Sequence, residues 1–84
     1  MESRVALIGI MLEDISQVER LNTLLTQYRD YIIGRMGIPY RAKNIQLISI
    51  AIDAPADTIS ALSGNLGNLN GVTAKVVYAK CNEA

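Results

Sequence analysis

Residues 45–79 read IQLISIAIDAPADTISALSGNLGNLNGVTAKVVYA, and the apolar pattern in this segment changes its period twice. Its opening residues, up to Asp53, alternate in the way that is typical of a β-strand. Both faces of this strand carry aliphatic side chains, with Ile48, Ile50 and Ile52 on one face and Ile45, Leu47 and Ala51 on the other. One face can pack under helices, and the other needs a different covering.

After the strand, Asp53 and Pro55 predict a helix start, with Asp53 as the cap and Pro55 in the first turn. Apolar residues from Ile59 to Leu69 then recur at spacings of three and four, which indicates an amphipathic helix. We expect Gly71 to stop this helix in the left-handed conformation. Residues 72–79 alternate again, so the segment predicts a strand, a helix and a second strand.

The N-terminal half repeats the same order. Residues 4–12 form a nearly unbroken apolar run, which favours a central strand that is apolar on both faces. Ser16 and Glu19 have the spacing of a capping box, and apolar residues at spacings of three and four predict a helix over about 16–29. Residues 31–38 predict a strand that ends at Pro39, with one face made of Ile32, Gly34, Met36 and Ile38.

The predicted order of elements is therefore β-α-β-β-α-β. A chain of this length with two split βαβ units folds most simply into a four-stranded antiparallel sheet with both helices on one face. This is the ferredoxin-like sandwich, an α+β fold. We expect a single domain over residues 1–84, with a flexible tail from about residue 80 to residue 84.

Composition excludes several classes of function. The chain is 50% hydrophobic and its formal net charge is zero, so it lacks the positive field of a protein that binds nucleic acid directly. It has no His and a single Cys, which rules out Ser–His and Cys–His catalytic pairs within one chain and predicts no metal site. We therefore expect no enzyme activity and no cofactor. The apolar runs are too short for a membrane span, and the lone Cys and the lack of a recognisable leader favour a cytoplasmic protein.

Two groups of residues are candidates for ligand binding. Glu13 and Asp14 end the first strand, where paired carboxylates could bind a cation or transfer protons, although complementing the dipole of the next helix explains them better. Gly64 and Gly67 lie inside the second predicted helix, where each glycine costs about 0.5–1 kcal/mol relative to Ala. Either a ligand or partner chain approaches the backbone there, or the helix packs closely on the sheet or loosens near its end.

A third group is a candidate for partner binding. Arg35, Tyr40 and Arg41 surround a turn that contains Gly and Pro, and guanidinium groups favour planar anions and carboxylates. The alternative is a solvated hairpin end with ordinary surface arginines. Cys81 lies in a polar tail, which favours an inert, disordered cysteine over a regulatory thiol.

Residues 57–77 resemble the second half of a family of small ACT-like proteins that are assigned as regulators of the iron-only hydrogenase system. The resemblance rests on an LSGxLGxxxGV pattern from Leu62 to Val72, on an RxGxPxR pattern over residues 35–41, and on the strand-ending Glu13-Asp14. It covers residues 4–79 and implies an ACT-type ferredoxin-like fold that associates through its sheet. The loop after the first strand lacks the glycine of amino-acid-binding ACT domains, and the missing His excludes the nickel site of the related repressors.

Two functions remain open. The first is a regulatory module that senses a small ligand at a subunit interface, where the first loop, the second helix and a neighbouring chain meet. The second is a protein–protein adaptor that binds no small molecule. In either case Ile45, Leu47 and Ala51 would form an exposed apolar patch on an isolated subunit, so we expect them to be covered in a homo-oligomer.

Overall fold

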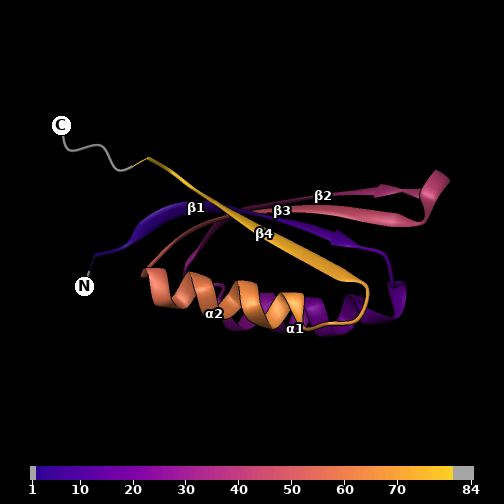
Figure 1. The fold of residues 1–84 in the computed structure, drawn as a ribbon, viewed down its shortest axis with the longest axis horizontal. Helices are drawn as coiled ribbons and strands as arrows, with labels where there is room; N and C mark the ends of the chain where they lie inside the picture. Colours follow the sequence, from indigo (N-terminus) through magenta and orange to yellow (C-terminus); the bar gives the residue numbers. More distant parts are fainter. Residues whose placement is uncertain (1, 81–84) are drawn as a thin grey trace.

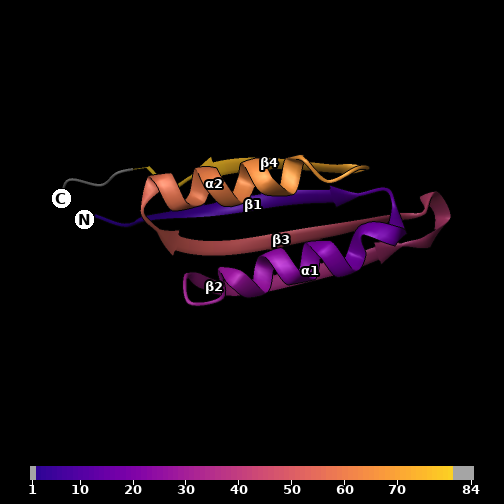
Figure 2. The same cartoon turned by 90° about the horizontal axis from the view of Figure 1, so that it is seen from below.

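The computed structural model describes residues 2–80, which form a four-stranded sheet with two α-helices on one face (Figures 1 and 2). The strands are β1 (Arg4–Leu12), β2 (Ile32–Tyr40), β3 (Ile45–Ala54) and β4 (Val72–Tyr78), and the α-helices are α1 (Val18–Gln27) and α2 (Ala56–Gly67). Neighbouring strands are antiparallel, in the order β2-β3-β1-β4. The predicted ferredoxin-like α+β fold is confirmed.

The core fills the space between the sheet and the helices. Figure 2 shows α1 along the β2–β3 side of the sheet and α2 along the β1–β4 side. The predicted inward face of β3 is confirmed, because Ile50 and Ile52 are fully buried and Ile48 is 5% exposed. The rest of this core is aliphatic and comes mainly from Ala6, Ile8, Ile10, Leu12, Leu21, Leu25, Ile59, Leu62 and Leu66. Burying one such Leu or Ile side chain contributes about 1.5–3 kcal/mol, so this layer dominates the stability of the fold.

The start of α1 differs from the prediction. The Asp14 carboxylate accepts hydrogen bonds from the backbone N–H of Ser16 at 3.0 Å and from the Ser16 hydroxyl at 2.7 Å. A 3-10 turn over Ile15–Gln17 follows, and α1 begins only at Val18. The capping box built on Ser16 was wrong, because a carboxylate is a stronger acceptor than a hydroxyl and Ser16 acts here as a donor.

The start of α2 also differs. Asp53 stays in β3 opposite Val5, and its backbone N–H donates to the carbonyl of Tyr31 at 2.9 Å, so its assignment as a helix cap was wrong. Pairing of β1 with β3 continues up to Ala54, and this longer ladder holds Asp53 in the sheet. Gly71 has the expected left-handed backbone, with φ at 71°, but it lies in the turn before β4, after α2 has ended at Gly67.

Strand β2 contains a bulge that the alternation did not reveal. Ile32 lies opposite Ile52, whereas Gly34 lies opposite Ala51, which leaves Ile33 as the extra residue. Ile32 therefore packs against the core, and the prediction that it shares a face with Gly34 was wrong. The strand also continues through Pro39, which an edge strand tolerates because no neighbour needs the missing N–H.

Candidate functional site

The sheet face opposite the helices, which we call the open face, is apolar and uncovered in the single chain. Strand register places eight of the large apolar residues that are exposed within residues 2–80 on it, namely Val5, Leu7, Met11, Met36, Ile38, Tyr40, Leu47 and Val77. Ile45 and Ala51, the other members of the predicted oligomer face, lie on the same side and are half-buried. The open face thus carries large exposed apolar side chains on all four strands of the described sheet.

A hollow of about 330 Å³ lies on the open face where β1 has no side chain. In the strand register, Gly9 lies between Ser49 of β3 and Lys75 of β4. The only neighbour within 4 Å of a Cβ added to Gly9 would be the Lys75 carbonyl oxygen, at 4.0 Å. We call this space the Gly9 hollow, and nothing among the described residues fills it.

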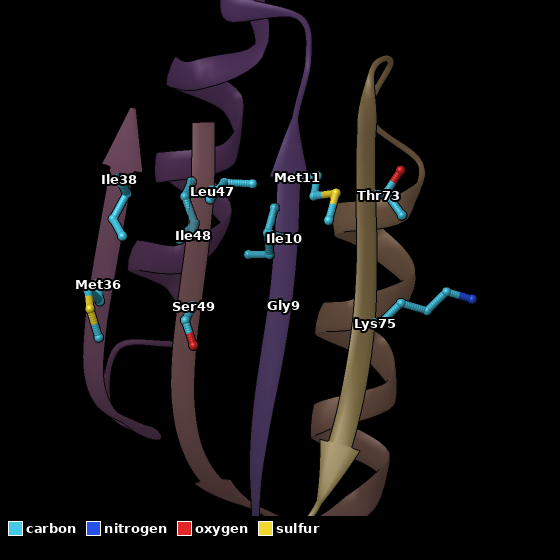
Figure 3. Close-up of a pocket in the computed structure, with 10 residues that line it drawn as sticks. All are labelled: Gly9, Ile10, Met11, Met36, Ile38, Leu47, Ile48, Ser49, Thr73 and Lys75. Atoms are coloured by element: carbon cyan, nitrogen blue, oxygen red, sulfur yellow. The ribbon is translucent and has the colours of Figure 1, made fainter. Parts of the chain in front are cut away.

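The walls of the Gly9 hollow are mostly apolar. Figure 3 shows Leu47 between β3 and β1, Met11 between β1 and β4, and Met36 on β2, around the bare backbone at Gly9. Ile38 continues the wall beside Leu47. Methionine side chains adapt to different shapes, so this wall can close around an apolar molecule.

The polar groups of the hollow are few. Ser49 and Thr73 contribute hydroxyl groups, and Lys75 is the only charged residue among the ten that line it. In Figure 3 the Lys75 side chain extends away from the strands. A hollow of this make-up suits a largely apolar ligand held by a small number of polar groups.

Gly9 was not among the site residues predicted from the sequence. The available signal was a glycine in the interior of a strand, which often marks the close approach of a ligand or of another backbone. In the sequence, Gly9 looks like one interruption in the apolar run of residues 4–12. Its importance depends on the strand register, which places Ser49 and Lys75 beside it.

The predicted ligand residues Glu13 and Asp14 lie in the loop after β1, packed against the turn that precedes β4. The backbone N–H of Glu13 donates to the Gly71 carbonyl at 2.7 Å. A Cβ on Gly71 would lie 2.6 Å from the Asp14 Cβ, so the two backbones pass each other closely. With its carboxylate engaged by Ser16, Asp14 has a clear role in local structure.

Gly64 and Gly67 are exposed on α2, and nothing lies within 4 Å of a Cβ added to either residue. Close packing of the helix on the sheet was therefore the wrong explanation for them. The α2 helix ends at Gly67, before Leu69, which fits the alternative of a helix that loosens near its end. The structure does not bring these glycines into contact with Glu13 or Asp14. No contact among the described residues of the single chain explains Gly64.

The three residues predicted to bind a partner are divided between two faces. Arg35 lies on the helix side of β2, where its guanidinium donates to the Asn22 side-chain oxygen at 2.6 Å and so ties β2 to α1. Tyr40 belongs to the open face and is 50% exposed. Together with Arg41 it borders a second hollow of about 200 Å³ at the β2–β3 turn. Figure 1 shows that this turn projects beyond the helices.

Comparison with known proteins places the chain in a family. Residues 4–76 match the model of the TM1266-like family, whose description reads "Iron-only hydrogenase system regulator, putative". The chain belongs to this family. The solved structure of the uncharacterized protein TM1266 from Thermotoga maritima is similar, with a TM-score of 0.89 and 38% sequence identity over 94% of this chain and 100% of that one. No curated protein matches.

The family match confirms the resemblance drawn from the LSGxLGxxxGV and RxGxPxR patterns. The TM1266-like description is of a regulator and names no reaction. Within residues 2–80 no polar or charged residue is buried as a whole, although the Gln17 side-chain oxygen is buried without a hydrogen-bond partner. The same residues contain no group of three or more His, Cys, Asp or Glu that could hold a metal ion. No helix in that range is long and apolar enough to cross a membrane. Cys81 and the rest of the predicted tail, residues 81–84, lie outside the described residues.

Proposed function

We propose that this chain is a non-catalytic regulatory module of the iron-only hydrogenase system, which acts as a homo-oligomer through its open face and binds a small molecule between its subunits. The observation that carries the proposal is the open face itself. Large apolar side chains such as Leu7, at 50% exposure, and Met11, at 51%, face water there in the single chain. Monomeric soluble proteins rarely gather so many large exposed apolar side chains on one face.

The open face has the size of a stable interface. Four strands about 4.8 Å apart and about 30 Å long give a footprint of roughly 600 Å². A standard interface buries about 800 Å² of accessible surface per partner, and the relief of side chains makes the accessible area of a face larger than its footprint. Two open faces packed on each other therefore suffice for a dimer.

A second copy suits this surface better than a charged partner does. The chain has zero formal net charge, so identical subunits do not repel one another at long range. On the open face itself, Lys75 and Asp53 are the charged residues that the strand register places among the apolar ones. The β2 edge is a poor alternative site, because Pro39 and the bulge at Ile33 hinder the pairing of another strand.

Light scattering coupled to size-exclusion chromatography tests the proposal with two matched variants. Leu47, 39% exposed on the open face, and Tyr31, 40% exposed outside it, are each replaced by Glu. We expect the native protein and Tyr31→Glu to form the same oligomer and Leu47→Glu to dissociate, because a carboxylate buried unpaired in an interface is strongly unfavourable. A native protein that runs as a monomer would overturn the proposal.

An adaptor that recruits another protein is the second candidate. The hollow at the β2–β3 turn favours it, since Tyr40 and Arg41 border this hollow at the projecting end of the sheet. Affinity capture tests it with the native chain, with the Arg41→Ala variant and with Lys43→Ala as the control from the same turn. The adaptor function predicts that a protein of the hydrogenase system binds the native chain and Lys43→Ala but not Arg41→Ala. Equal capture by all three argues against it.

A further inference from the structure

We propose that the Gly9 hollow binds a small, flat, mainly apolar molecule that carries one acidic group, with the Lys75 ammonium as its counter-ion. This inference deepens the proposed function and rests on it, since it names the class of ligand that would lie between two open faces. The hollow lies away from the loop after β1 and from α2, which carry the ligand residues predicted from the sequence.

The size and the floor of the hollow indicate a flat molecule. Its volume of about 330 Å³ falls at the lower end of the range for ligand pockets, roughly 300–1,000 Å³. Because Gly9 has no side chain, a planar ring can lie directly against the backbone of β1. Ser49 on one side of Gly9 is small, and no described side chain fills the space over Gly9.

The walls indicate that most of the ligand is apolar. Met11, Met36 and Ile38 are each more than half exposed in the single chain. An apolar ring inserted between them leaves water for an apolar surrounding, worth about 25 cal/mol per Å² of its own apolar surface. Thioether groups also make favourable contacts with aromatic rings, which suits the two methionines in the wall.

The charge of the lining indicates an acidic group. Lys75 is the only charged residue in it, and no carboxylate is present to neutralise that charge. Among the side-chain hydrogen bonds recorded for residues 2–80, Lys75 takes part in none, so its head group is available. Its flexible four-carbon stem lets the ammonium turn from the outward position in Figure 3 towards Thr73 and the rim of the hollow.

Fluorescence titration with two related probes tests the proposal. Anilinonaphthalene sulfonate has an apolar body of planar aromatic rings with one anionic group, and N-phenylnaphthylamine has the same body without the charge. Each is titrated into the native protein and into the variants Lys75→Gln, Gly9→Val and Lys43→Gln, the last as a lysine control at the distant β2–β3 turn. Thermal unfolding monitored by circular dichroism checks that every variant is folded. We expect Gly9→Val to fold, because its Cβ has room and valine favours strands.

We expect the native protein to prefer the sulfonate. Lys75→Gln should weaken binding of the sulfonate about tenfold, the change expected when a hydrogen bond to a charged group is lost, and leave the uncharged probe unaffected. Gly9→Val should abolish binding of both probes, and Lys43→Gln should change neither. Sulfonate binding that is unaltered in Lys75→Gln, or binding of either probe that survives in Gly9→Val, overturns the inference.

The oligomeric state of each sample, measured by sedimentation velocity, separates this inference from the proposed function. If the native protein is an oligomer but the Lys75→Gln and Gly9→Val variants bind the probes as the native protein does, the proposed class of ligand is wrong and the proposed oligomer is unaffected. A monomeric native protein overturns the proposed function, whatever the probes do.

Discussion

Replacing Gly71 by Ala should destabilise the fold far more than an ordinary surface substitution. Gly71 has a φ of 71°, and a left-handed backbone costs a residue with a side chain about 1–2 kcal/mol. Its new Cβ would also lie 2.6 Å from the Asp14 Cβ and 3.1 Å from the Asp14 backbone nitrogen. Shifting the loop to relieve this overlap adds about 1–3 kcal/mol, by analogy with overpacked sites.

The sum, about 2–5 kcal/mol, is a large share of the total stability. A domain of this length is stable by about 4–13 kcal/mol, and each kcal/mol lowers the melting temperature by about 4–8 °C. Differential scanning calorimetry of Gly71→Ala should therefore show a melting temperature lower by about 8–40 °C.

Gly64→Ala is the matched control for this experiment. Gly64 is exposed in α2 and a Cβ there meets nothing within 4 Å, so alanine should raise the stability by about 0.5–1 kcal/mol through its better helix propensity. A melting temperature of Gly71→Ala equal to that of the native protein would refute this prediction, and so would a loss of stability in Gly64→Ala as large as that in Gly71→Ala.

Three further predictions concern the helix cap, the core and nucleic acid. Asp14→Ala should cost about 0.5–2 kcal/mol in urea unfolding and Ser16→Ala clearly less, because the Asp14 carboxylate is the acceptor that caps the 3-10 turn leading into α1; equal losses would contradict this assignment. Leu62→Ala should cost about 2–5 kcal/mol in the same assay, because Leu62 is fully buried, and a loss no larger than that of a surface substitution would contradict the packing of α2 on the sheet. A gel-shift assay with purified protein should show no specific DNA complex at physiological salt, since the chain has no net positive charge; a specific complex would refute this.

The order of elements could be predicted because periodicity reports directly on burial. The faces of β3 show this most clearly, since alternation alone separated Ile50, which is fully buried, from Leu47, which is 39% exposed. Burial of alternate aliphatic side chains is the largest energy term in this fold, and it leaves a strong trace in the sequence.

Features that depend on the choice between local partners could not be predicted in this way. Asp14 and Ser16 both suit a helix start, and only the structure shows which one accepts the hydrogen bond. The bulge at Ile33 leaves no composition signal, so strict alternation placed Ile32 on the wrong face. The Gly9 hollow was missed for a related reason, because it arises from side chains on four strands whose register the sequence does not state.

The central claim is that a second subunit covers the open face in solution. Methyl NMR of labelled methionines, with a water-soluble gadolinium chelate added, measures this directly at Met11 and Met36. In the single chain these side chains are 51% and 64% exposed, so the chelate would broaden both methyl signals. We predict that both signals stay sharp in the native protein and broaden in Leu47→Glu. Strong broadening of both signals in the native protein would contradict the claim.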